Sequence, residues 1–94
     1  MWVIGAELLF KAARKHAAAA GRLRAWLAEA EEAEWSCPQD IRDRFPSASF
    51  VGDDLVVFNI GGREYRLVVR VDYRLGVLDI LRFGTHAEYS KWKL

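Results

Sequence analysis

The spacing of the apolar residues changes along this chain, and that change constrains the fold more than any other feature. Up to residue 34 the apolar residues recur at helical spacing. One such stripe consists of Leu23, Trp26, Leu27 and Ala30. From Leu55 onward, apolar and polar residues alternate with the period of two that is typical of half-buried strands. A helical half followed by a strand half predicts an α+β domain with an antiparallel sheet.

The predicted elements follow the order β-α-α-α-β-β-β-β-α in a single domain over residues 1–94. A strand at 2–4 precedes two helices between residues 6 and 34, which we expect to pack as a hairpin on one face of the sheet. Glycine costs about 1 kcal/mol inside a helix, so the break between them is expected at Gly21. Ser36 and Gln39 have the spacing of a capping box for a short helix that ends near Phe45, before Pro46.

Strands are predicted at 49–51, 55–60, 63–73 and 77–83, and a last helix begins near His86. Gly61 and Gly62 separate two alternating runs, which is a hairpin signal because primed turns need positive φ. A two-residue turn there places residue 59 opposite 64 and residue 57 opposite 66. In this register Asn59 shares a face with Arg66 and Arg70, and the opposite face is apolar.

Composition limits the classes of function that need consideration. The only cysteine, Cys37, excludes an internal disulfide and, with two histidines in the chain, argues against a structural metal site or another cofactor. No apolar run approaches the roughly 20 residues of a membrane span, and the apolar start lacks the basic segment of a signal peptide. We therefore expect a cytoplasmic protein that does not act at a membrane.

The net charge of +1 conceals an uneven distribution along the chain. Residues 1–54 carry seven basic and nine acidic residues, whereas residues 55–94 carry seven basic and four acidic ones, a net charge of +3. Most of these basic residues are arginines, whose planar fork fits phosphate groups. The basic strand face is either an ordinary solvated surface or a phosphate-binding one.

Thr85 followed three residues later by Glu88 predicts a second capping box, which places His86 at the first helical position. A helix N-terminus attracts anions and disfavours a charged imidazole, so we expect a phosphate-binding end with a neutral His86. Tyr89 lies at i+3 from His86 and can share its face. Taken alone, these two residues are better explained as a tolerated polar residue and a packing aromatic.

The combination of these residues points to RNA chemistry. A base, a phenol, arginines and an amide at one edge of a sheet fit phosphodiester cleavage, in which the 2′-OH attacks the adjacent phosphorus. Such a reaction needs a proton acceptor, cationic donors for the charge that develops on phosphate, and a proton donor for the leaving oxygen. These roles require no metal ion.

Several dispersed motifs resemble the HigB family of toxins from bacterial type II toxin–antitoxin modules, which are related to the RelE-like toxins. The motifs are Trp35-x-x-Pro38-x-Asp40-Ile41, Pro46–Phe50, Val57–Gly62, Tyr65–Val68 and Gly84–Tyr89. The resemblance covers nearly the whole chain in the same order and spacing. It implies a compact α+β ribonuclease that cuts mRNA at the ribosome and is held inactive by a HigA antitoxin with a helix-turn-helix domain.

The resemblance also implies roles for individual residues. His86 would be the general base or acid, Tyr89 a positioning or proton-transfer group, and Arg66 a clamp on the phosphate. Asn59 would orient the nucleotide, or else support the glycine turn. Three further basic residues are assigned to RNA binding from their placement and charge alone: Arg63, Arg70 and Lys91.

Two other functions use the same features. The chain could be a non-catalytic module that binds RNA or the ribosome, or an inactive toxin whose remaining role is complex formation. Trp26 and Leu27 in the predicted helical hairpin are candidates for an antitoxin-binding groove, although a core position for Trp26 is the favoured interpretation.

Overall fold

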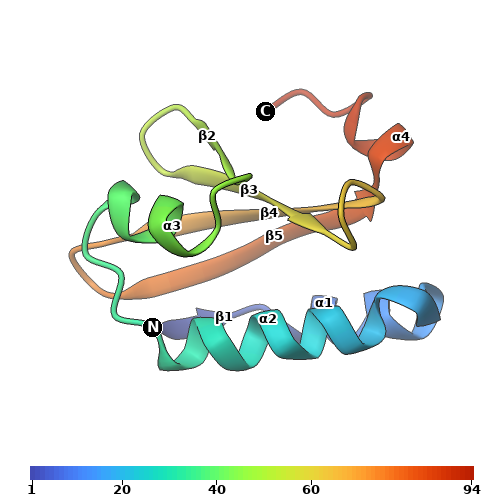
Figure 1. Cartoon of the computed structure of the whole chain (residues 1–94), viewed down its shortest axis with the longest axis horizontal. Helices are drawn as coiled ribbons and strands as arrows, with labels where there is room; N and C mark the ends of the chain where they lie inside the picture. Colours follow the sequence, from blue (N-terminus) through green and yellow to red (C-terminus); the bar gives the residue numbers. More distant parts are fainter.

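The computed structural model, which describes residues 1–94, contains an open five-stranded sheet with the strand order β1-β5-β4-β3-β2 (Figure 1). The strands are β1 (Trp2–Ile4), β2 (Ser49–Val51), β3 (Leu55–Ile60), β4 (Tyr65–Asp72) and β5 (Val77–Thr85). Strands β2 to β5 pair antiparallel in sequence order, whereas β1 pairs parallel with the outer side of β5. The predicted α+β class and a mainly antiparallel sheet are confirmed.

The chain has four helices, of which the first two form a layer against one face of this sheet (Figure 1). They are α1 (Ala6–Lys15), α2 (Ala20–Glu32), α3 (Pro38–Arg44) and the one-turn α4 (His86–Tyr89). Helices α1 and α2 lie side by side under the sheet, and α4 lies at the end where β5 stops. The other face of the sheet carries the side chains of Asn59, Arg66 and Arg70 together with two buried valines, Val57 and Val68.

The break between the first two helices lies at His16, and the prediction of a break at Gly21 is wrong. Helix α1 ends at Lys15, and a 3-10 turn over Ala17–Ala19 leads into α2. The His16 ring packs edge-on against Tyr65 at 5.2 Å between ring centroids. Gly21 is exposed inside α2 with open space around it. Packing of a side chain on the sheet therefore decides the break, and the low helix propensity of glycine does not.

The start of α3 differs from the predicted capping box between Ser36 and Gln39. The backbone N–H and the hydroxyl of Ser36 both donate to Asp40 Oδ2, at 2.9 and 3.1 Å. Gln39 donates to Asp43 instead of reaching back. These hydrogen bonds from Ser36 hold the pKa of Asp40 below its ordinary value of 3.8. The helix begins where predicted, but a carboxylate one turn later secures it.

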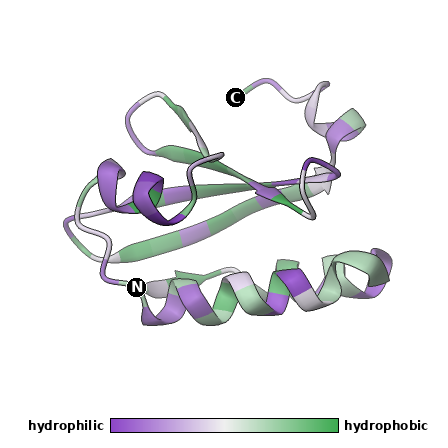
Figure 2. Cartoon of the chain, in the orientation of Figure 1, coloured by the Kyte–Doolittle hydropathy of each residue, from purple (hydrophilic) through white to green (hydrophobic).

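The core lies between the sheet and helices α1 to α3, and Phe58 is at its centre. The Phe58 ring contacts Trp26 and Phe45 edge-to-face, each at 5.2 Å, and stacks on Trp35 at 6.3 Å. Trp26 is only 4% exposed, so the favoured core assignment is confirmed. Figure 2 shows mainly hydrophobic strands beside an α2 with alternating hydrophobic and hydrophilic bands, and the buried residues of α2 are Leu23, Trp26 and Ala30.

The turn between β3 and β4 is longer than predicted. Ile60 pairs with Tyr65 and Asn59 with Arg66, so the loop spans the four residues 61–64. The predicted pairing of 59 with 64 is wrong by two residues. Because side chains alternate with a period of two, this error leaves every side chain on its predicted face. It does place Asn59 directly across from Arg66.

A β-bulge interrupts the pairing of β4 with β5. Val68 pairs with Arg82 and Val69 with Ile80, so Leu81 is an extra residue in β5. The bulge reverses the alternation of the last part of β5. Arg82 and the residues in phase with it therefore share the face of Arg66, and Phe83 turns to the core side.

Candidate functional site

Helix α4 is held by the predicted capping box. Thr85 Oγ1 accepts the backbone N–H of Glu88 at 3.1 Å, and the Glu88 carboxylate accepts the N–H of Thr85 at 2.9 Å. The second of these bonds is the main reason why the pKa of Glu88 lies below its ordinary value of 4.5. His86 is exposed at the first helical position, and Tyr89 is half-buried one turn later.

Arg66 and His86 are joined by a direct hydrogen bond between Arg66 Nη2 and His86 Nδ1, 3.1 Å long. A guanidinium has only donors, so Nδ1 must be the acceptor and the imidazole proton must lie on Nε2. The Nη1 atom of Arg66 also donates to the backbone carbonyls of Arg63 and Tyr65, at 2.9 and 3.2 Å. The contact therefore fixes both the position of the guanidinium and the tautomer of His86.

The N-terminus of α4 offers fewer free N–H groups to a phosphate than its position in the sequence predicts. The N–H of His86 donates to the Glu64 carbonyl at 2.9 Å, and the N–H of Glu88 is taken by Thr85. The Glu88 carboxylate already lies at this helix end. Arg66 has five N–H donors and uses three of them within the protein, which leaves donors that an anion can accept from.

Two residues that the sequence analysis did not assign extend this cluster. The Arg66 guanidinium lies 5.6 Å from the Tyr89 ring centre, and the Tyr89 ring meets the Trp92 ring edge-on at 5.8 Å. Arg82 lies 5.4 Å from the centre of the Trp92 ring. Together these four side chains form a continuous cation–aromatic row, and we call it the Arg66–Arg82 row.

Gly84 explains why Trp92 can lie so close to the sheet. A Cβ atom at Gly84 would lie 2.8 Å from Cζ2 of Trp92, which is closer than real contacts allow. The sequence signal for this contact was a glycine at the end of an alternating strand, since such a glycine often marks a close approach. The glycine could be recognised in the sequence, but the pattern did not indicate which residue contacts it.

The other predicted residues lie at different distances from this cluster. Asn59 Nδ2 donates to the Ser47 carbonyl at 2.9 Å, which ties β3 to the segment before β2 and gives the amide a structural role away from the glycine turn. Arg70 is four residues along β4 from Arg66, about 13 Å away, and it pairs with Asp54 at 3.3 Å between Nε and Oδ2. The structure therefore separates Arg70 from the cluster. Arg63 and Lys91 are exposed at its rim.

The site is an open surface. Neither Arg66 nor His86 lines any of the hollows in the molecule. No group of three or more His, Cys, Asp or Glu side chains is arranged to hold a metal ion. None of the helices combines the length and the apolar character that a membrane crossing needs.

The open sheet, its helical layer and the basic end of its free face are consistent with a RelE-like toxin fold. Residues 19–92 match the family model of the HigB toxin, described as the RelE-like toxic component of a toxin–antitoxin system. The chain therefore belongs to the HigB toxin family, and an antitoxin is its expected partner. No individually curated protein matches the chain.

Proposed function

We propose that this toxin cleaves mRNA in the cytoplasm by attack of a 2′-OH on the adjacent phosphodiester, and that it does so on mRNA engaged by the ribosome. The observation that carries the proposal is the hydrogen bond between Arg66 and His86, with Tyr89 beside both. It combines a cation for phosphate with an imidazole of defined tautomer. An open site suits a strand that lies across a surface better than it suits a small molecule.

The reaction requires two proton transfers and one displacement at phosphorus. A base takes the 2′-OH proton, O2′ bonds to phosphorus, and the bond to O5′ breaks as that oxygen receives a proton. The products are a 2′,3′-cyclic phosphate and a 5′-OH end. Arg66 supplies charge stabilisation through the donors that its internal bonds leave free. When Arg66 turns toward the phosphate, it releases His86 Nδ1, which can then accept a proton.

The Arg66–Arg82 row supports a role in binding RNA beside the scissile phosphate. Bases of single-stranded RNA stack on aromatic rings, and arginines contribute cation–π contacts and contacts to the backbone. Trp92 and Tyr89 are the aromatic members of this row, and Lys91 lies next to them on the chain. Arg63 lies in the loop between β3 and β4, and we assign it to contact the RNA backbone. A HigA-type helix-turn-helix antitoxin is the partner that we expect to hold the toxin inactive.

The same row supports a second function, a non-catalytic module that binds RNA or the ribosome, because stacking and charge need no proton transfer. The two functions differ in the RNA ends that they leave. We would induce the wild type, His86→Ala and Arg74→Ala in cells and map mRNA 5′ ends. Arg74 is an exposed arginine in the turn at the opposite end of the sheet, which makes it a matched surface control.

Cleavage predicts new 5′-OH ends with the wild type and with Arg74→Ala, and their loss with His86→Ala. Growth arrest by the wild type without new ends would refute cleavage and favour the binding module. If His86→Ala produces as many new 5′ ends as the wild type, His86 is not the proton-transfer group of the reaction.

A further inference from the structure

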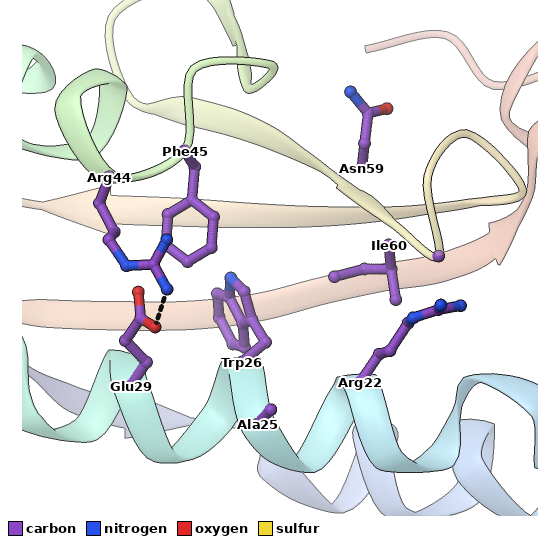
Figure 3. A pocket seen from close by; sticks show the side chains of 9 residues that line it. Arg22, Ala25, Trp26, Glu29, Arg44, Phe45, Asn59 and Ile60 are labelled. Atoms are coloured by element: carbon purple, nitrogen blue, oxygen red, sulfur yellow. Dashed lines mark hydrogen bonds and ion pairs between the residues drawn. The ribbon is translucent and has the colours of Figure 1, made fainter.

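A hollow of about 230 Å³ lies between α2, the end of α3 and the end of β3 (Figure 3). Its floor is Trp26 of α2, and its rim includes Arg22 and Glu29 from the same helix and Arg44 from the end of α3. The side chain of Asn59 marks the far edge and points away from α2. The hollow is too small for most cofactors, whose pockets start near 300 Å³.

Two polar atoms of residues that line this hollow are buried without a hydrogen-bond partner. They are Nε1 of Trp26, a donor, and Oε2 of Glu29, an acceptor. Trp26 is 4% exposed and its ring is fixed edge-on against Phe58. An unpaired buried donor is destabilising, so a ligand carbonyl that takes the place of the atoms covering it is favoured. A peptide unit offers one C=O and one N–H, the complement of these two atoms.

The edge of β3 beside the hollow has no strand pair, and the segment before β2 is tied to it by the hydrogen bond from Asn59 to the Ser47 carbonyl. Strand β2 accompanies β3 only as far as the pair of Ser49 with Val57. Residues 58–60 of β3 therefore have a strand neighbour on the β4 side alone. An unpaired strand edge is a template for an added extended segment. Such a segment would run along β3 and pass over the hollow.

The charges at the rim indicate which side chains that segment carries. Glu29 is already paired with Arg44, at 2.6 Å between Oε1 and Nη2 (Figure 3). Arg22 has no ion-pair partner, and its guanidinium lies against Gly61. The free cation favours an acidic side chain. A peptide can bring one carboxylate to Arg22 and pass Glu29 with an uncharged backbone, whereas an RNA strand carries a phosphate at every nucleotide and is repelled by Glu29 at short range.

We infer that this hollow and the adjoining edge of β3 bind an extended acidic segment of the antitoxin, with a backbone carbonyl on Trp26 Nε1 and a carboxylate on Arg22. The inference rests on the antitoxin partnership of the proposed function and is independent of RNA cleavage. The segment would end at Asn59, opposite Arg66, so its binding would reach the border of the candidate RNA surface.

The test is titration of the toxin with its cognate antitoxin, using paired tryptophan variants. Trp26→Phe removes the indole N–H and keeps an aromatic ring, and Trp35→Phe does the same at a buried tryptophan that does not line the hollow. We expect Trp26→Phe to weaken antitoxin binding about tenfold, the effect of one lost hydrogen bond, and Trp35→Phe to change it less than twofold. Equal effects of the two variants would overturn the inference.

A charge pair gives a second comparison on the same helix. Arg22→Glu should weaken antitoxin binding at least tenfold, whereas Arg24→Glu, at an exposed residue away from this hollow, should not. If Arg22→Glu weakens RNA binding and leaves antitoxin affinity unchanged, the occupant is RNA and the inference is wrong. In the wild type, the indole N–H resonance of Trp26 should shift on antitoxin binding, and an unchanged resonance would contradict the contact even if a variant misfolds.

The outcome is separable from that of the proposed function. A toxin that produces no new RNA ends but shows this pattern of antitoxin affinities would refute cleavage and leave the docking surface in place. A toxin that produces new RNA ends but shows equal antitoxin affinities for the paired variants would refute the docking surface and leave cleavage in place.

Discussion

Loss of the capping box at Thr85 should release the helix that carries His86. Helix α4 has only four residues, far below the length at which an isolated helix is stable. Thr85→Ala removes the acceptor for the Glu88 N–H, and the loss of a threonine cap costs about 1 kcal/mol. That cost lowers the ratio of docked to undocked α4 about fivefold. Thr85→Ser keeps the hydroxyl and should behave like the wild type.

Hydrogen exchange at Ser90 measures this effect directly, because the Ser90 N–H donates to the His86 carbonyl at 3.1 Å. We expect about fivefold faster exchange in Thr85→Ala and at most a fivefold loss of RNA cleavage. His86→Ala should cost far more, since general acid–base groups contribute about 10²–10⁴-fold. Unchanged exchange in Thr85→Ala, or equal effects of alanine and serine, would refute the reasoning.

The same helix should respond to acid in a defined direction. The pKa of Glu88 is lower in the folded protein than its ordinary value of 4.5, so the stabilisation is fully present above that value. It is lost as the pH falls through the lowered pKa. Exchange at Ser90, corrected for its intrinsic rate, should therefore accelerate below about pH 4.5 in the wild type. Glu88→Gln should lack this acceleration, and its persistence there would assign the effect to another group.

Three further substitutions test the site and the core. Arg66→Lys keeps the charge but loses the planar pair of donors that matches a phosphate, so RNA cleavage should fall about 10²–10³-fold with little change in urea unfolding. Activity near that of the wild type would contradict the clamp. Gly84→Val places carbon atoms where the Trp92 ring lies. It should alter tryptophan fluorescence and weaken RNA binding. RNA affinity equal to that of the wild type would show that Trp92 does not contribute to RNA binding. Phe58→Ala removes the central ring of the core and should lower the free energy of unfolding by about 3–5 kcal/mol, measured by urea denaturation; a loss below 1 kcal/mol would contradict its central position.

Local features of the site could be predicted from the sequence because their causes lie within a few residues. The capping box of Thr85 and Glu88 depends on a spacing of three, and the structure contains both of its hydrogen bonds. The shared face of Asn59 and Arg66 depends only on the period of the strands. Sequence spacing alone placed these groups correctly although the predicted register was wrong by two.

Features set by contacts between distant segments could not be predicted in this way. The helix break depends on His16 meeting the ring of Tyr65, which lies on another element. Trp92 joins the site because Gly84 has no side chain in its way. The hydrogen bond between Arg66 and His86 spans 20 residues, and it required the observed pairing of β4 with β5. Each depends on a tertiary contact that no local pattern specifies.

Because Leu81 is an extra residue in the pairing of β5 with β4, the number of residues in β5 decides which side chains face outward, as their types do. Deleting it would place Arg82 directly after Ile80, and regular alternation would then keep Arg82 on the face of Arg66 and Phe83 on the core side. A strand that kept all its residues but lacked the bulge would instead turn Arg82 toward the core, and Trp92 would lose its contact with Arg82. Among related sequences, a gap of one position at Leu81 should therefore mark a strand without the bulge that presents the same residues on the face of Arg66.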